Sequence, residues 1–187
     1  MNDSMVLLLA LLHTHPHIPE PMRSCLANHQ DRIAAQAQEG SDQNGVPAGI
    51  LLTVGFLESH LGCHPRSGGC WGAPIDPNHR LTAGTHHHAA VALATSYRVC
   101  GTWEGAISRF RCGLCRCPAP RTMPMPASGV CPQYWRPVMV GETLMCRQAR
   151  GYNAAFAVRM VEQLYTAANI TVPERLYRAQ PRSAARP

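Results

Sequence analysis

Hydrophobic residues in the first third of the chain recur at helical spacings and predict two helices. The first covers residues 24–39 and is expected to end at Gly40. Its apolar side would be formed by Ile33, Ala34 and Ala37. The second covers residues 47–61, is apolar on almost every side and is expected to end at Gly62. A helix without a polar face belongs at the centre of its domain.

The remaining chain predicts three more helices and no convincing alternating strand. Two helices are expected over residues 86–100 and 103–112, each after a threonine suited to an N-cap. Residues 114–140 hold six prolines and three cysteines and are expected to be irregular. Residues 142–168 are expected to form a long closing helix. The caps would be Thr85 and Thr102, with Gly113 as a C-terminal stop, and the closing helix would turn Ala154, Val158, Val161 and Tyr165 to one side.

The chain therefore divides into an N-terminal segment, a mainly α domain and a tail. The segment, residues 1–23, contains a short apolar run at residues 5–12 with no basic residue before it. This favours a short helix that packs on the domain over a cleaved signal peptide. The domain spans residues 24–168. The tail, residues 169–187, is rich in proline and arginine and would serve as a solubilising end or dock on an acidic surface.

Composition narrows the classes of partner. The chain has 187 residues, its 17 basic side chains are all arginine, and its net charge is +6. This charge favours an anionic partner such as nucleic acid, anionic lipid or a cell-wall polymer. Nucleic acid is the least favoured, because the sequence has no basic stripe or recognised DNA-binding motif. No apolar run approaches the ~18 residues of a transmembrane helix, so we expect no membrane span.

Nine cysteines indicate an oxidising compartment, and the odd number leaves at least one thiol unpaired within the chain. Residues 112–117 contain a C-x-x-C-x-C sequence that could be half of a zinc site. No second C-x-x-C is present, so a disulfide cluster is favoured and no metal or cofactor is expected. Three successive histidines, residues 86–88, point in different directions and cannot all bind one ion. The disulfide candidates are Cys63, Cys70, Cys112, Cys115, Cys117 and Cys131, with Cys63 and Cys70 able to close a loop between them.

Glu58 is the only ionisable side chain between Asp42 and His60, and it comes late in the most apolar helix. Burial there would raise the pKa of its carboxyl group and suit it to act as a general acid in glycoside cleavage. The alternative is that Glu58 pairs with an arginine at the helix end. For a second carboxylate, Asp76 is the nearest candidate, whereas Glu104 is explained by its place at a helix start. A single acid suits a mechanism without an attacking water.

Three blocks of sequence resemble, in order and spacing, the soluble lytic transglycosylase and goose-type lysozyme superfamily. The first is Val54-Gly-Phe-Leu-Glu58-Ser59, followed by a Gly-rich loop through Gly72. The second is Trp103-Glu-Gly-Ala-Ile-Ser-Arg-Phe-Arg-Cys-Gly113. The third is a closing helix with Glu142 and Tyr152, similar to the family's E-T-x-x-Y-V ending. The resemblance spans about residues 33–165 and implies a lysozyme-like helical domain with long Cys- and Pro-rich loops.

The resemblance implies cleavage of the MurNAc–GlcNAc bond of peptidoglycan with a 1,6-anhydro product and no cofactor. Glu58 would act first as acid and then as base, and Ser59 would donate a supporting hydrogen bond to the substrate or to Glu58. Two departures stand out. The family's Gly-Leu-Met-Gln segment appears as Gly72-Ala-Pro-Ile75, without the glutamine, and its Tyr-Asn pair appears as Phe110-Arg111. Phe110 keeps an apolar wall, and Arg111 could bind a carboxylate of the peptide stem.

The leading hypothesis is thus a peptidoglycan lytic transglycosylase, in the periplasm, outside the cell or on a phage or injection-type particle. Its partners would be glycan strands and other subunits of such a phage tail or injection apparatus. Lysozyme-type attack by water, with Asp76 as base, stays open. So does a non-catalytic structural or wall-binding component that retains the fold. Further sugar-binding candidates are Trp71, Asp76, His79, Arg80 and Trp103.

Overall fold

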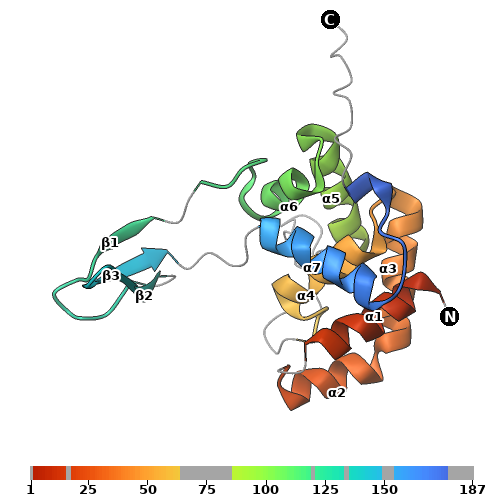
Figure 1. Ribbon diagram of the computed structural model, residues 1–187, viewed down its shortest axis with the longest axis horizontal. Helices are drawn as coiled ribbons and strands as arrows, with labels where there is room; N and C mark the ends of the chain where they lie inside the picture. The colour runs from red at the N-terminus through yellow and green to blue at the C-terminus, as the bar shows by residue number, and fades with distance from the viewer. Residues whose placement is uncertain are drawn as a thin grey trace, which may run out of the picture.

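A computed structural model describes residues 2–15, 18–63, 86–118, 121–132, 135–148 and 154–176. Within these residues the protein is mainly helical and carries one small antiparallel sheet (Figure 1). The helices are α1 (Asp3–Thr14), α2 (Glu20–Asn28), α3 (Gln30–Asn44), α4 (Ala48–Ser59), α5 (His86–Cys100), α6 (Trp103–Cys112), α7 (Ala154–Ala167) and the 3-10 helix η1 (Glu174–Leu176). The strands are β1 (Thr122–Pro124), β2 (Trp135–Val140) and β3 (Thr143–Gln148).

Helix α4 lies at the centre of the helical body, as its apolar sequence predicts. It packs against α1, α3, α5 and α7, and ten of its 12 residues are buried. Helix α6 packs on α5 and α7 at the end of the body from which the sheet extends (Figure 1). All-round burial of this kind gives the body one continuous core.

Helix α1 belongs to that core. Its apolar residues Leu7, Leu8 and Leu11 are fully buried and contact the same cluster as α4. The Asn2 side chain accepts a hydrogen bond from the Met5 amide at 3.0 Å and caps the helix. The prediction of a short N-terminal helix packed on the domain is confirmed.

The first predicted helix is wrong in its bounds, because two helices occupy that region. Residues 24–39 fall across α2 and α3, which meet at His29. Helix α3 also continues past Gly40 to end at Gly45, which has a left-handed φ of 66°. Gly40 instead permits close packing, since a Cβ there would lie 3.0 Å from Leu51 Cδ1.

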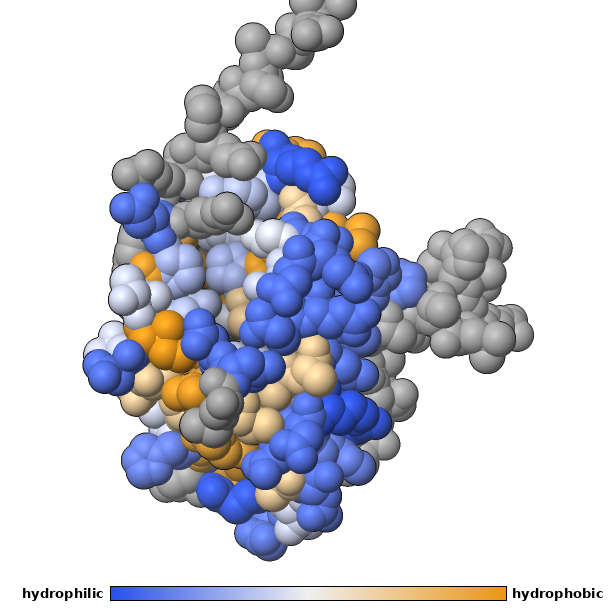
Figure 2. Space-filling model, turned by 90° about the vertical axis from the view of Figure 1, so that its right-hand side faces the viewer, coloured by the Kyte–Doolittle hydropathy of each residue, from blue (hydrophilic) through white to orange (hydrophobic). Residues whose placement is uncertain are grey.

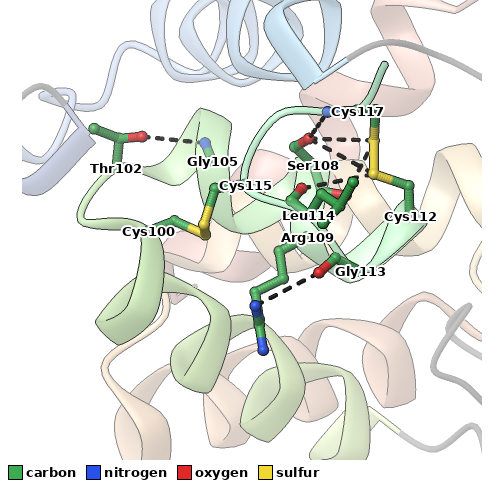
Figure 3. The surroundings of a disulfide bond; sticks show 10 residues. All are labelled: Cys100, Thr102, Gly105, Ser108, Arg109, Cys112, Gly113, Leu114, Cys115 and Cys117. Carbon is green, nitrogen blue, oxygen red and sulfur yellow. Dashed lines mark hydrogen bonds between the residues drawn. A yellow bond between two sulfur atoms is a disulfide. The ribbon is translucent and has the colours of Figure 1, made fainter.

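The prediction for α6 is confirmed at both ends. The Thr102 hydroxyl accepts a hydrogen bond from the Gly105 amide at 3.1 Å, and Gly113 ends the helix with φ 79° (Figure 3). Helix α5 also ends where predicted, at Cys100. The outward face of α3 is polar, and hydrophilic side chains cover much of the corresponding face of the body (Figure 2).

The expectation of no strands is wrong. The three strands form an antiparallel sheet in the order β1-β3-β2, with Arg136 opposite Arg147 and Met139 opposite Leu144. Residues 114–140 therefore include β1 and β2, and the predicted long helix over residues 142–168 is β3 followed by α7. On α7, Val161 and Tyr165 are buried as predicted, and the packed face continues through Ala157, Met160 and Leu164.

The sheet and its connecting loop project from the helical body as an arm, defined here as residues 121–132 and 135–148 (Figure 1). The disulfide Cys131–Cys146 links the loop to β3. Two further disulfides, Cys100–Cys115 and Cys112–Cys117, hold the segment between α6 and the arm (Figure 3). In the described residues, no helix combines the length and the apolar character needed to cross a membrane.

Candidate active site

The candidate acid, Glu58, sits at the exposed end of an otherwise buried helix. Near the start of α4, the Gly49 amide donates a hydrogen bond to Tyr165 Oη at 3.3 Å. A Cβ at Gly49 would lie 2.4 Å from the Tyr165 ring, so only glycine permits this approach of α4 to α7. The helix carrying Glu58 is therefore fixed against the core along its length.

The chain leaves α4 through three successive residues in the left-handed region. His60, Leu61 and Gly62 have φ values of 50°, 54° and 86°. The Leu61 amide donates to the Gly55 carbonyl at 3.0 Å and the His60 amide to the Phe56 carbonyl at 2.8 Å, a Schellman-type end. The predicted stop at Gly62 lies two residues too late. Left-handed backbone at two non-glycine residues is strained, and such strain gathers at functional sites.

The Glu58 carboxylate lies beside the guanidinium of Arg111 on α6. Arg111 Nε is 3.6 Å from Glu58 Oε1, and the two side chains are 15% and 27% exposed. This distance is that of an ion pair. The expectation that Glu58 is buried is wrong, because the last turn of α4 emerges from the core. The alternative, a pair with an arginine at the helix end, is what the structure shows.

Ser59 does not face the solvent. It is 3% exposed, its hydroxyl donates to the Gly55 carbonyl at 3.1 Å, and it accepts from the Gly62 amide at 3.1 Å. The hydroxyl is thus used to close the end of α4. Its contribution to the site is to hold the backbone next to Glu58.

Aromatic side chains and a disulfide surround this end of α4. The Phe56 ring lies between the rings of His15 and His60, with both centroid distances 5.1 Å. Burial lowers the pKa of His15, which keeps its ring neutral near pH 7. The disulfide Cys25–Cys63 ties α2 to the residues that follow α4. The sequence interpretation missed His15 and Cys25, because only the fold brings them to Glu58's helix.

The other candidate site residues on α6 differ in how far their side chains are buried. Phe110 is partly buried and packs against the core, which agrees with an apolar wall beside Arg111. Trp103 is 2% exposed and stacks on Tyr97 at a centroid distance of 4.2 Å, so its ring has no free face for a sugar. Glu104 is exposed in the first turn of α6, where a carboxylate complements the helix dipole.

Several predicted residues lie outside the described part of the chain. They are Cys70, Trp71, Gly72, Ile75, Asp76, His79, Arg80 and Tyr152. The expectation that Glu142 of the third block lies on the closing helix is wrong, since Glu142 lies in the turn between β2 and β3. The first two blocks are brought together by the Glu58–Arg111 pair.

The prediction that these cysteines form disulfides is confirmed, but one predicted pairing is wrong. Cys112, Cys115, Cys117 and Cys131 are all half-cystines, as the favoured disulfide cluster requires. The Cys63–Cys70 pairing is wrong, because Cys63 bonds to Cys25. Among the described residues, no cluster of three or more His, Cys, Asp or Glu side chains has a geometry suited to a metal ion. His86 Nε2 instead lies 3.1 Å from Glu39 Oε2.

Comparisons with protein-family models, curated proteins and solved structures give no match for this chain.

Proposed function

We propose that this protein cleaves the MurNAc–GlcNAc bond of peptidoglycan as a lytic transglycosylase on a lysozyme-like fold, with Glu58 as the acid and base. The observation that carries the proposal is the Glu58–Arg111 contact at 3.6 Å. It joins the end of α4 to the end of α6, the two helices whose sequences resemble the family. A carboxylate that is partly exposed, on a helix fixed on all sides, is positioned to meet a ligand.

The chemistry requires two proton transfers, both through Glu58. Protonated Glu58 gives its proton to the glycosidic oxygen as the bond from that oxygen to the MurNAc anomeric carbon breaks. The MurNAc C6 oxygen then bonds to the anomeric carbon, and its proton returns to Glu58. No water is consumed, so no second carboxylate is needed to activate one.

Arg111 has to leave Glu58 before this can occur. An ion pair between partly exposed side chains stabilises a protein by only about 0–1 kcal/mol, so the pair is easily opened. A carboxylate of the peptide stem would bind the guanidinium in place of Glu58. Substrate binding would thereby free the acid for protonation.

The test is incubation of the pure protein with peptidoglycan sacculi, followed by mass analysis of the products. Anhydro-muropeptides made by the natural sequence and lost in Glu58→Gln are the expected result. Glu104→Gln is the matched control, because it removes an exposed carboxylate from α6 and should leave turnover unchanged. Products with reducing ends would assign water attack instead, and no turnover by the natural sequence would overturn both enzymatic mechanisms.

The ion pair also favours a second candidate, a non-catalytic wall-binding or assembly component. In that case Arg111 would hold Glu58 as a structural partner, and neither the natural sequence nor Arg111→Gln would cleave peptidoglycan. Sacculus binding that survives Glu58→Gln, without any turnover, is the result expected for this class. Four disulfides support an oxidising compartment for either function. The periplasm, the cell exterior or a virion is the location we propose.

A further inference from the structure

The arm exposes apolar side chains at its far end, the β2–β3 hairpin. Met139, Val140 and Leu144 are 61%, 42% and 48% exposed. Met139 and Leu144 are directly opposite one another in the register and share one face of the sheet. Val140, the next residue along, points to the other face. The hairpin end is therefore apolar on both faces. A groove in a partner protein that contacted only one face would leave the other face exposed to water.

Positive charge lies behind this apolar end. Arg136 and Arg147 are also directly opposite one another, three residues further from the turn. This separation is about 10 Å along the strands. Like charges in a directly opposed pair destabilise a sheet. Neither guanidinium has an acidic partner within the described residues, so an anion at this position would relieve the repulsion.

We propose that the arm docks on an anionic phospholipid bilayer, with the hairpin end in the interface and the arginine pair at the headgroups. Interfacial elements bury their apolar residues about 5–10 Å below the headgroups, which matches the spacing between the two pairs. A bilayer surrounds an inserted element on all sides, as the two apolar faces require. A second copy of the arm would bring like charges together and is disfavoured. The inference does not depend on peptidoglycan cleavage.

One residue opposes the contact. Glu142, in the turn between the strands, is exposed and carries the only negative charge among the described residues of the arm. An anionic surface repels this carboxylate. Its removal should therefore strengthen binding, whereas a purely structural role of the hairpin predicts no change.

The test uses the full chain with its disulfides intact and sedimentation with vesicles. Binding is expected to vesicles of phosphatidylglycerol and phosphatidylcholine in equal parts, and not to phosphatidylcholine alone. Arg136→Gln with Arg147→Gln should weaken it by about fivefold for each charge removed. The matched control is Arg32→Gln with Arg98→Gln, which changes the net charge equally at exposed sites on the helical body. Glu142→Gln should strengthen binding by about fivefold.

The apolar contribution is tested by Met139→Ser with Leu144→Ser, expected to weaken binding by about tenfold or more. Its control is Val99→Ser, which removes an apolar side chain that is 55% exposed on α5. Unchanged thermal midpoints show that each variant is folded. No sedimentation with anionic vesicles, equal binding to neutral vesicles, or arm variants that behave like their controls would each overturn the proposal. A protein partner for the arm would give the first of these outcomes.

Discussion

The helical body and the arm are stabilised by different interactions. The body has a continuous core of buried apolar side chains contributed by every helix from α1 to α7. In the described residues of the arm, the one buried side chain is Cys146, a half-cystine. The body therefore depends on removal of apolar surface from water, and the arm on strand pairing and a covalent link. An element without a core is free to expose apolar residues, and the arm does so.

The largest expected effect comes from replacing one leucine by alanine in each region and comparing the loss of stability. Leu51 on α4 is fully buried, and Leu51→Ala should lower the free energy of unfolding by about 2–5 kcal/mol. Leu144→Ala, in the arm, removes a side chain that is 48% exposed and should cost under about 1 kcal/mol. Urea denaturation of both variants with intact disulfides measures the difference. Equal losses would mean that the arm shares the core of the body.

The second prediction compares two disulfides of equal loop length. Cys131–Cys146 and Cys100–Cys115 each join residues 15 apart, so each contributes about 3 kcal/mol in a loop-entropy account. Cys131→Ser with Cys146→Ser should abolish the protection of the strand amides in hydrogen exchange, because the arm has no core to hold it.

Cys100→Ser with Cys115→Ser should lower stability without this local loss, since α5 and α6 still pack on one another. Hydrogen exchange read by mass spectrometry gives both results from one experiment. Protected strands in the first variant would show that hydrogen bonding alone maintains the arm.

The same difference explains which parts of the fold the sequence could predict. The bounds of α6 follow from Thr102 and Gly113, which act on backbone groups within a few residues. The centre of α4 follows from its uninterrupted apolar composition. No proline or glycine marks the break between α2 and α3 at His29, so it was not predicted from the sequence. Local chemistry was therefore sufficient for ends with a dedicated cap, and insufficient where packing sets the boundary.

The strands were not predicted, because the sheet has no buried face and their sequence therefore lacks an alternating apolar pattern. Val138 lies between the exposed residues Pro137 and Met139, and Cys146 lies between two partly buried residues, so burial does not alternate clearly along β2 and β3. Pairing of Cys131 with Cys146, which spacing alone cannot reveal, brings the loop to β3. For the site, sequence reasoning found Glu58 and Arg111 separately. Their contact, and the emergence of Glu58 from the core, depend on the packing of helices far apart in the chain.

The third prediction concerns strain at the end of α4, a feature of the body only. His60 has a φ of 50°, a conformation that costs a non-glycine residue about 1–2 kcal/mol. His60→Gly and His60→Ala both remove the ring contact with Phe56, so their difference isolates the backbone cost. The glycine variant should be more stable by about 1 kcal/mol in thermal denaturation. Equal stabilities would mean that the ending of α4 is not strained.

The smallest expected effect is a dependence of the body's stability on alkaline pH. Burial raises the pKa of Tyr165 above its usual value of about 10, and the nearby carboxylate of Asp3 adds to the rise, while the hydrogen bond from the Gly49 amide opposes it. The folded state therefore prefers the protonated phenol. The stability that Tyr165 contributes is fully present below about pH 10 and is lost as pH rises through the higher pKa of the folded state.

Tyr165→Phe should cost about 1 kcal/mol at pH 7, because the Gly49 amide loses its acceptor. It should also remove part of the alkaline decline, so the curves of the variant and the natural sequence should converge above pH 10. Urea denaturation across pH 7 to pH 11 measures this convergence. Strand amides of the arm should show the same exchange protection in both proteins at pH 7, since Tyr165 is buried in the helical body. A variant that declines as steeply as the natural sequence would place the alkaline-sensitive group elsewhere.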